Sequence, residues 1–427
     1  MKSVENFLRN HKLMATDIDF GYLVSTFSDE MIRGLEGKNS SLRMIPTYIE
    51  PENEFLKDTP VLAIDAGGTN FRAALITFRS NGKIETGETA KHTMPGIEGE
   101  ISGKEFFETV ASYIRPLAEK TDRIGFCFSY PTEIFPNKDG RLLQFCKEVQ
   151  APEVVGQLIG KTLLETLGTP EKKIVLLNDT VATLLAGKSA SFGRSYDSYI
   201  GYILGTGTNT CYIEQNCNIL KNPELDQQGS QIINVESGAF GKAPRTDIDI
   251  LFDSSTMDPG KYGFEKMFAG GYFGGLCLTV LRSASSEGIF SAGTGSKLSA
   301  IKELTSEEAN DFAMKQSDDK NPLNRIFTDD REAGACIQII DTLIDRAACL
   351  AAANMAAVVL KTGKGKSYDK PVLITIEGTA FYKLQNLKMR FEKYLENFLS
   401  GGRKRFVNYA EVKQSSLIGA ALAGLTD

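Results

Sequence analysis

Tryptophan is absent from this chain of 427 residues, and histidine occurs only twice, at His11 and His92. Two histidines leave little room for a histidine-bound metal centre or for catalysis by a histidine base. The seven cysteines form no C-x-x-C pair, so the sequence has neither a zinc knuckle nor a dithiol redox motif. This usage favours reduced thiols, and we expect a cytoplasmic protein.

Long apolar runs and an excess of basic residues are also missing. No uninterrupted apolar stretch reaches the roughly 20 residues that a membrane-spanning helix needs, and the polar N-terminus lacks the apolar segment of a secretion signal. Lys and Arg number 48 against 54 Asp and Glu, which gives a net charge of -6. We therefore expect neither a membrane nor a nucleic acid as a partner.

Two common nucleotide-binding motifs are incomplete. Gly-Lys-Ser/Thr triplets begin at Gly160, Gly187 and Gly365, but positions 155, 182 and 360 lack the upstream glycine of a P-loop. No G-x-G-x-x-G opens a helix after a strand, which argues against a dinucleotide oxidoreductase. Phosphates, if they bind, must therefore bind other glycine-rich turns.

Two related glycine-threonine turns are present instead. Apolar residues 61–64 lead into Asp65-Ala66-Gly67-Gly68-Thr69-Asn70, and residues 199–203 lead into Leu204-Gly205-Thr206-Gly207-Thr208-Asn209. Glycine lets the backbone approach a ligand and aim its N–H groups at phosphate oxygens. One such turn is equally typical of an ordinary β-hairpin. Two of them, the first preceded by an aspartate, indicate a duplicated fold that holds one nucleotide from both sides.

The apolar segment 174–177 ends in Asn178-Asp179, and a helical pattern begins at once. For an isolated segment of this kind, a plain helix cap is by far the commoner explanation. The alternative is that Asp179 lies at the carboxyl end of a strand, where open α/β sheets bind their ligands. There it would accept the proton of a substrate hydroxyl, as general bases do in phosphoryl transfer.

Strand and helix patterns alternate along the chain, and the length favours two or three domains. We expect helices over 4–35, 105–118, 161–167, 332–362 and 416–425, with another beginning at 181. We expect strands over 61–65, 71–78, 83–89, 123–129, 174–177 and 371–376. The segment 41–48 has the pattern of an extended arm, and the Ser- and Gly-rich segment 283–299 that of a loop. The fold class is mixed α/β.

In order and spacing, these motifs resemble the eukaryotic-type hexokinase family over nearly the whole chain. The arm is similar to the family's S-x-L-x-M-L-P-T, and Phe126–Pro131 to its sugar loop. Lys147 follows Pro131 by sixteen residues, the place of the family's W-T-K lysine. Residues 64–72 and 205–209 resemble the family's two phosphate motifs, and residues 177–183 its base motif. Residues 234–240 and 264–267 resemble its two glutamate-bearing sugar motifs. Residues 376–379 and 416–422 resemble its adenosine and terminal-helix motifs. One motif alone is weak evidence, whereas the ordered set is specific.

The resemblance implies a duplicated ribonuclease-H-like fold of the actin-like ATPase kind, with two lobes and a cleft between them. The smaller lobe would span 59–199, with the C-terminal helix 414–427 returning to it, and the larger lobe 1–58 and 200–413. The implied activity is ATP-dependent phosphorylation of a hexose, above all glucose, at its 6-hydroxyl. Mg²⁺ is the implied cofactor, and the assembly is a monomer or a homodimer.

Each matching residue acquires an implied role. Asp65 would hold Mg²⁺ through water, while Asp179 and Lys147 would be catalytic. The implied hexose-binding residues are Ser129, Cys146, Lys147, Asn178, Asp179, Asn209, Glu236 and Glu265. The implied nucleotide-binding residues are Gly67, Gly68, Thr69, Asn70, Thr206, Gly207, Gly378, Thr379 and Ser416.

Departures from the family pattern gather near the sugar. Cys146 replaces the threonine of W-T-K, Ser237 replaces a tryptophan, and Gly275 replaces an acidic residue, whereas Glu377 for Asp is a mild change. Two alternatives therefore stay open: a sugar-binding regulator without catalysis, and an actin- or chaperone-like ATPase with protein partners. A bacterial-type glucokinase with a zinc site is disfavoured because its Cys-rich signature is absent.

Overall fold

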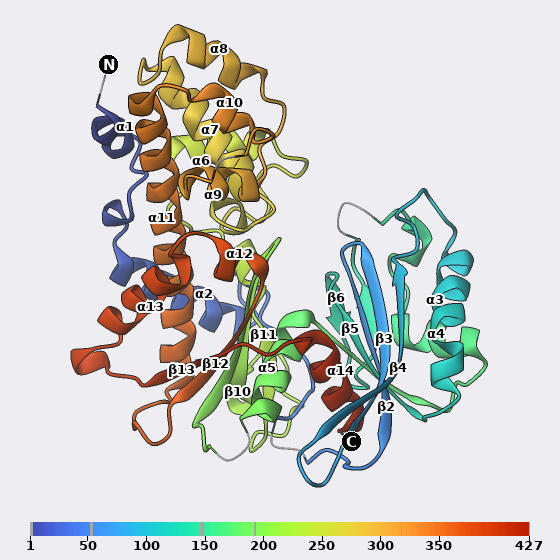
Figure 1. Cartoon of the computed structure of the whole chain (residues 1–427). Helices are drawn as coiled ribbons and strands as arrows, with labels where there is room; N and C mark the ends of the chain where they lie inside the picture. The colour runs from blue at the N-terminus through green and yellow to red at the C-terminus, as the bar shows by residue number, and fades with distance from the viewer. Residues whose placement is uncertain (1–2, 52–53, 146–148, 192–193, 317, 427) are drawn as a thin grey trace.

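The computed structural model describes residues 3–51, 54–145, 149–191, 194–316 and 318–426. Within these residues the chain forms two lobes, each built on its own sheet, which lie side by side (Figure 1). We call the part around the five-stranded sheet the small lobe and the part around the six-stranded sheet the large lobe. Two helices lie between the sheets: α5 (Asp179–Ala190) and α14 (Ser415–Leu425).

The small-lobe sheet has the strand order β4-β3-β2-β5-β8. Its strands are β2 (Pro60–Gly67), β3 (Asn70–Phe78), β4 (Ile84–Thr93), β5 (Arg123–Phe128) and β8 (Lys173–Leu177), and its helices are α3 (Gly103–Ala118) and α4 (Ile159–Leu167). A separate hairpin joins β6 (Thr132–Ile134) to β7 (Gly140–Leu142). β2 and β3 are antiparallel, whereas β2, β5 and β8 are parallel, so the carboxyl ends of these three strands meet at one edge.

Both faces of the small-lobe sheet are covered, which explains its continuous apolar strands. Successive side chains of a strand point to opposite faces. Leu62 and Ile64 accordingly pack with residues of α3 and α4, while Val61 and Ala63 pack with residues of α5 and α14. The sequence therefore showed a run without alternation, as expected of a sheet that is buried on both sides.

The large-lobe sheet has the strand order β1-β11-β10-β9-β12-β13. Its strands are β1 (Ile45–Pro46), β9 (Ser198–Leu204), β10 (Thr208–Gln215), β11 (Ser230–Asn234), β12 (Val372–Glu377) and β13 (Val407–Ala410). Its helices are α1 (Val4–Asn10), α2 (Phe20–Leu35), α6 (Asp247–Ser254), α7 (Phe273–Ser286), α8 (Ala292–Ala300), α9 (Ser306–Ala313), α10 (Pro322–Ile326), α11 (Asp330–Thr362), α12 (Thr379–Lys383) and α13 (Leu387–Phe398). The arm predicted at 41–48 contributes β1, which pairs with β11.

Helix α11 runs along the centre of the large lobe (Figure 1). Among the described residues it is the one helix with the length and apolarity to cross a membrane, yet 89% of its most apolar stretch is buried inside the protein. Asp345 and Arg346 interrupt that stretch, which is why the sequence shows no continuous apolar run. Burial on this scale is what a core helix requires.

Helix α14 approaches its neighbours through small residues. A Cβ on Gly419 would lie 2.0 Å from the carbonyl oxygen of Ala182 in α5, and one on Gly125 of β5 would lie 1.7 Å from the carbonyl oxygen of Ala420. No side chain fits at either position. The two glycines therefore set how closely α14 approaches α5 and the small-lobe sheet.

Most of the expected elements are confirmed. α3 includes Pro116 close to its C-terminal end, as predicted, and β12 begins one residue after the predicted 371. The loop predicted over 283–299 is wrong, because α7 ends at Ser286 and α8 occupies Ala292–Ala300. The serines are satisfied within these helices: Ser283 Oγ donates to the carbonyl of Thr279, and Ser291 caps α8.

Candidate functional site

Both glycine-threonine turns are the tips of antiparallel hairpins. Gly67 pairs with Asn70 where β2 turns into β3, and Leu204 pairs with Thr208 where β9 turns into β10. Gly68 has a φ of 57°, a left-handed conformation that favours glycine. The Tyr130 hydroxyl donates to the Gly68 carbonyl at 3.0 Å and fixes the first tip.

The predicted phosphate ligands are accessible. Gly68, Thr69, Asn70 and Thr206 are exposed at the two tips. Gly378 has a φ of 126° and precedes α12, whose first residue, Thr379, is also exposed. Backbone N–H groups in tight turns of this kind form anion-binding concavities.

Asp65 lies near the end of β2 with its side chain buried. Arg72 of β3 forms an ion pair with its Oδ2, and the Ser416 hydroxyl of α14 donates to the same oxygen at 3.0 Å. Ser416 was predicted to bind the nucleotide, and in the structure its hydroxyl contacts Asp65 and accepts from Arg72. The charge of Asp65 is thus partly balanced and its orientation is fixed.

Asp179 is the first residue of α5, directly after β8. Asn178 is the helix cap, since its Oδ1 accepts from the Thr180 amide at 2.9 Å. Asp179 Oδ1 also accepts from this amide, at 2.8 Å, and Asp179 as a residue is half-buried. The sequence offered a cap and a site carboxylate as alternatives; Asn178 supplies the cap, so Asp179 is not needed for it.

The environment of Asp179 raises its pKa to about 7. Loss of hydration in the protein is the largest cause, followed by the negative charge of Glu377; the Thr180 amide opposes both, and Asp65 and Glu236 raise the pKa further. These carboxylates come from both lobes and converge on one place. Perturbation by burial plus specific charges is typical of functional sites.

Three predicted hexose ligands form one hydrogen-bonded cluster. Asn209 Nδ2 donates to Glu236 Oε1 at 3.3 Å and to Asn178 Oδ1 at 3.4 Å. Asn234, at the end of β11, joins them: it accepts from Asn209 at 2.8 Å and donates to Glu236 Oε1 at 2.8 Å. Asn234 was not predicted as a site residue. The available signal was its place at the end of an apolar strand pattern, two residues before Glu236.

Glu236 has left-handed backbone angles, with φ 60° and ψ 48°. A non-glycine residue is held there only when its surroundings determine it, and such residues cluster at ligand sites. Burial raises the pKa of Glu236, although hydrogen bonds from Asn234 and Asn209 favour the charged form. The result is a fixed carboxylate at the lobe boundary that accepts hydrogen bonds.

Glu265 begins a short 3-10 helix, 265–267, rather than lying within a longer amphipathic helix. Its Oε2 accepts from the Thr208 amide at 2.8 Å. The predicted hexose residue Glu265 and the second glycine turn are therefore in direct contact. In the small lobe, Ser129 follows β5 and its amide donates to the carbonyl of Ala66, next to the first turn.

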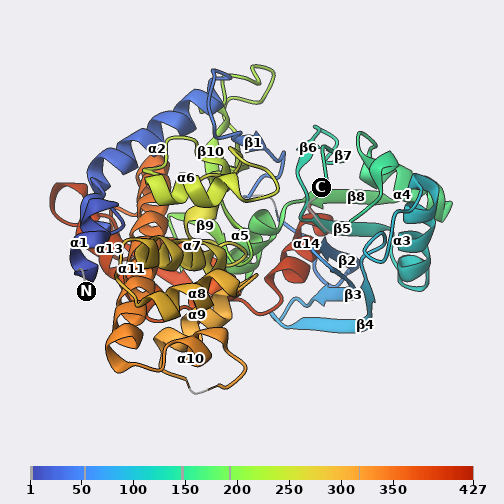
Figure 2. The same cartoon turned by 90° about the horizontal axis from the view of Figure 1, so that it is seen from above.

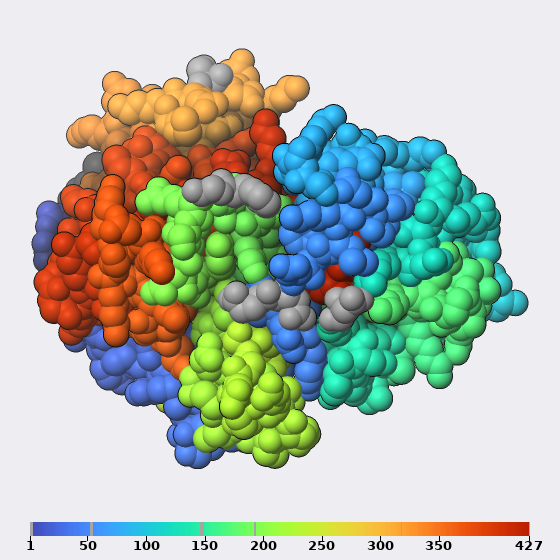
Figure 3. Space-filling view, turned by 90° about the horizontal axis from the view of Figure 1, so that it is seen from below, coloured from blue at the N-terminus to red at the C-terminus, as the bar shows by residue number. Residues whose placement is uncertain are grey.

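A pocket at the lobe boundary brings these elements together. Its lining residues are Ile45, Thr47, Phe128, Tyr130, Thr132, Ile134, Leu176, Leu177, Asn178, Asn234 and Glu236. The polar residues come mainly from the large-lobe side, and the small lobe contributes an aromatic and aliphatic wall. Figure 3 shows the two lobes meeting on the face seen from below.

Glu377 is a second residue that the site prediction omitted. It is the last residue of β12, whereas Asp65 lies two residues before the end of β2, and it accepts from the Thr183 hydroxyl at 3.3 Å. The pKa of Glu377 is raised, mainly by burial and further by the negative charge of Asp65. The place of Glu377 at the carboxyl end of a strand was the signal in the sequence. The predicted residues Cys146 and Lys147 lie outside the described residues.

Comparisons with known proteins identify the family of this chain. Two family models, both described as hexokinase, match residues 4–189 and 199–426. The chain belongs to the hexokinase family. Hexokinase-3 of Rattus norvegicus is 30% identical over 382 residues, which cover 83% of this chain and 40% of the rat protein. The chain thus spans about two fifths of the length of that mammalian relative.

A plant relative in the hexokinase family matches over most of its length. The hexokinase-like 1 protein of Arabidopsis thaliana is 27% identical over 437 residues, covering 95% of this chain and 87% of that protein. One solved structure, a hexokinase from Schistosoma mansoni complexed with glucose, has a TM-score of 0.80 at 23% identity, covering 99% of this chain and 100% of that one. The predicted fold class, α/β with two lobes of the actin-like ATPase kind, is confirmed.

The fold is also shared with more distant sugar kinases. A ROK hexokinase from Thermus thermophilus has a TM-score of 0.52 at 16% identity, covering 86% of this chain and 98% of that one. At this identity the likeness concerns the fold alone. Among the described residues, no group of three or more His, Cys, Asp or Glu has the arrangement to hold a metal ion.

Proposed function

We propose that this member of the hexokinase family transfers the γ-phosphoryl group of ATP to the 6-hydroxyl of a hexose, above all glucose. One observation carries the proposal: the cluster of Asn178, Asn209 and Glu236 lies beside Asp179, whose neighbours belong to both lobes. A relative of the same fold was solved with glucose. The cluster has the chemistry to bind hydroxyls, and Asp179 has the chemistry to accept a proton.

Sugar recognition follows from the donors and acceptors of the cluster. Each sugar hydroxyl is both a donor and an acceptor, so side-chain amides and carboxylates can satisfy it in two directions. Asn209, Asn178, Glu236 and Glu265 supply these groups, and Ser129 and Lys147 would add to them. A site of this kind rejects analogues that lack a matching hydroxyl, because its own polar groups would then stay unpaired.

Asp179 would act as the general base. A carboxyl group with a pKa of about 7 is a stronger base than an ordinary aspartate and is still substantially ionised at neutral pH. Its Oδ1 is held by the Thr180 amide, which fixes the direction of the carboxylate. Positioned proton transfer of this kind contributes roughly 10²–10⁴ in rate.

The phosphates of ATP would lie between the two glycine turns, with the Gly67–Asn70 and Thr206–Gly207 amides and hydroxyls as donors. Asp65 fits a magnesium ion that is held through water, because Mg²⁺ keeps much of its hydration and usually binds one or two carboxylates plus phosphates. Arg72 and Ser416 fix the orientation of that carboxylate. When bound, Mg²⁺ neutralises charge on the phosphate oxygens.

The small lobe, with α14 packed on its sheet, would move against the large lobe; the predicted boundary at 199 falls two residues inside β9 of the large-lobe sheet, so the moving part would end before Ser198. Sugar that contacts both lobes would drive their closure and exclude water from the phosphoryl group. This order of events protects ATP from hydrolysis when no sugar is present.

The proposal is tested by ADP release from the purified protein with a panel of hexoses. Asp179→Asn should lower turnover by roughly 10²–10⁴ while glucose binding is retained, because Asn178, Asn209 and Glu236 remain. Asp369→Asn, at an exposed position, is the matched control and should keep full turnover. Near-normal turnover of Asp179→Asn would reject the base assignment.

Two other outcomes would reject the kinase function itself. Glucose binding without ADP release would favour a sugar-binding regulator. ATP hydrolysis that is independent of every hexose would favour an ATPase of the actin or chaperone kind.

A further inference from the structure

The second glycine turn is packed against a sugar carboxylate. A Cβ on Gly207 would lie 2.6 Å from Glu265 Oε2 and 3.2 Å from its Cδ. Gly207 has no positive φ, so its backbone conformation does not call for glycine. A side chain at this position would therefore have to displace the Glu265 carboxylate.

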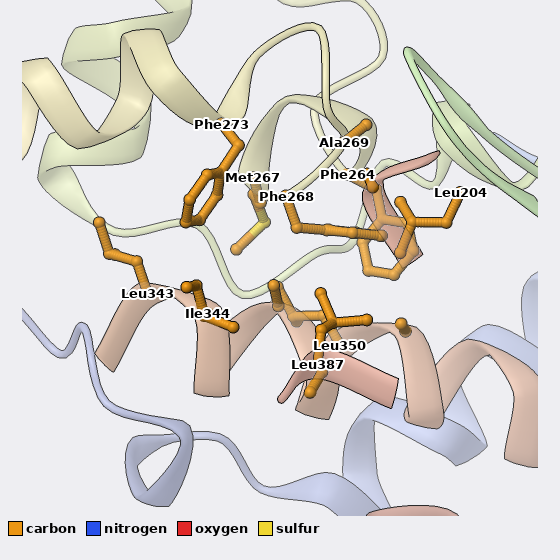
Figure 4. Close-up of a cluster of buried hydrophobic side chains, with 14 of the residues drawn as sticks. Leu204, Phe264, Met267, Phe268, Ala269, Phe273, Leu343, Ile344, Leu350 and Leu387 are labelled. Carbon is orange, nitrogen blue, oxygen red and sulfur yellow. The ribbon is translucent and has the colours of Figure 1, made fainter. Parts of the chain in front are cut away.

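Glu265 has little freedom to move away from this contact. On another side, a Cβ on Gly238 would lie 3.0 Å from the same Oε2. Phe264 and Phe268, on either side in sequence, are fully buried and lie against α11 next to Leu350 (Figure 4). The 3-10 helix that carries Glu265 is therefore anchored in the large-lobe core.

The small lobe repeats this arrangement. A Cβ on Gly67 of the first turn would lie 2.9 Å from the Cβ and 3.0 Å from the Oγ of Ser129, the hexose residue of that lobe. A Cβ on Gly205 of the second turn would instead be 3.5 Å from its nearest neighbour, the Cα of Gly378, which is ordinary contact. Only one glycine of each turn thus supports a sugar residue.

We propose that Gly207, a residue of a phosphate turn, is also a positioning residue for the hexose. Its missing side chain and the adjacent Thr208 amide hold the Glu265 carboxylate in place to accept from sugar hydroxyls. This inference rests on the proposed function, because Glu265 must be a sugar ligand. It follows that part of the sugar affinity is set by the turn itself, before any nucleotide binds.

The test is titration calorimetry with glucose in the absence of nucleotide. Gly207→Ala should weaken glucose binding about tenfold or more, as expected when a charged hydrogen-bond partner is displaced. Gly205→Ala, two residues earlier in the same turn, should leave the glucose Kd within about twofold, because the new methyl group would make only ordinary van der Waals contact. The two alanine variants are compared by glucose affinity and not by turnover, because both glycines belong to the turn assigned to phosphates and either change could alter ATP binding.

A double-mutant cycle separates positioning from general damage. Glu265→Asp shortens the side chain by one methylene, which leaves room for the new methyl group. In that background, Gly207→Ala should cause little further loss of glucose affinity, because the carboxylate has already left its place. Additive losses in the cycle would overturn the proposal, and so would two alanine variants with equal affinity.

Two results distinguish this inference from the proposed function. If the wild-type chain binds neither glucose nor another hexose of the panel, the sugar assignment fails. If wild type and Gly207→Ala bind glucose equally, the positioning role fails and the kinase proposal stands. If circular dichroism shows that Gly207→Ala does not fold, the double variant Gly207→Ala/Glu265→Asp decides. A double variant that also fails to fold would show that the new methyl group clashes with something other than the carboxylate, and would overturn the inference.

Discussion

At the scale of single residues, the site depends on how one carboxylate is surrounded. Asp179 keeps an ordinary backbone role at the start of α5, yet burial and the charges of Glu377, Asp65 and Glu236 bring its pKa to about 7. The lobes supply these charges from segments far apart in the sequence. The raised pKa, which suits the proposed base at neutral pH, thus arises from the fold rather than from the Asn-Asp-Thr segment itself.

The pH dependence of kcat/KM for glucose should report this pKa. A base whose pKa is raised is protonated below it, so kcat/KM should fall tenfold per pH unit below about 7. Glu377→Gln removes the second-largest cause of the shift, and the acid limb should then move to lower pH. A pH series from 5.5 to 9 for both proteins, with exposed Glu307→Gln as control, measures the displacement. An unmoved limb would contradict the electrostatic account.

The sequence predicted those site residues that belong to recognisable motifs. The structure brings Asn178, Asn209 and Glu236 together, and it shows Glu265 in contact with the second turn. Asn234 and Glu377 have weak signals in the sequence, because the contacts that tie them to the site, from Asn209 to Asn234 and from Thr183 to Glu377, join segments that only the fold brings together. Pair distances across a sheet depend on register, and register cannot be derived from spacing along one chain.

At the scale of elements, helices and strands were predicted where burial follows a regular pattern. The failure at 283–299 has a physical cause: serine and glycine are weak helix formers, and tertiary packing decides such segments. α7 places Leu278, Val280 and Leu281 in the large-lobe core, which outweighs the propensity of its serines. Composition alone does not reveal that packing.

Helix α14 gives a prediction at this scale. Gly419→Ala places a methyl group 2.0 Å from the Ala182 carbonyl oxygen, so α14 and α5 must separate, and we expect a loss of roughly 2–4 kcal/mol in the free energy of unfolding. Gly334→Ala in α11 meets nothing within 4 Å and should instead stabilise the protein by roughly 0.5–1 kcal/mol. Urea unfolding of both variants measures the contrast. Equal effects would show that α14 is not closely packed in solution.

At the scale of the whole molecule, two sheets with separate cores meet around α5 and α14 (Figure 2). The sequence implied two lobes through its family resemblance, but the contacts between them are visible only in the structure. One of these contacts is a hydrogen bond from Gln144 Nε2, just after β7, to the hydroxyl of Tyr262 at 3.2 Å. Gln144 precedes the segment of Lys147 by three residues, and Tyr262 precedes Glu265 by three.

This hydrogen bond joins the two lobes. If the lobes close on a sugar, as proposed, its removal should favour the open form. In Tyr262→Phe the ring stays and the hydroxyl is lost, while the left-handed φ of 52° at this position is kept. Glucose shifts the equilibrium between the open and closed forms only by the difference in its affinity for them. When the open form is favoured, more glucose is therefore needed to close the lobes. Small-angle X-ray scattering over a glucose titration should show half-maximal compaction at several-fold higher glucose, with the same fully bound radius of gyration. The exposed Tyr22→Phe should match wild type. A Tyr262→Phe curve that superimposes on that of wild type would mean that the contact does not contribute to closure.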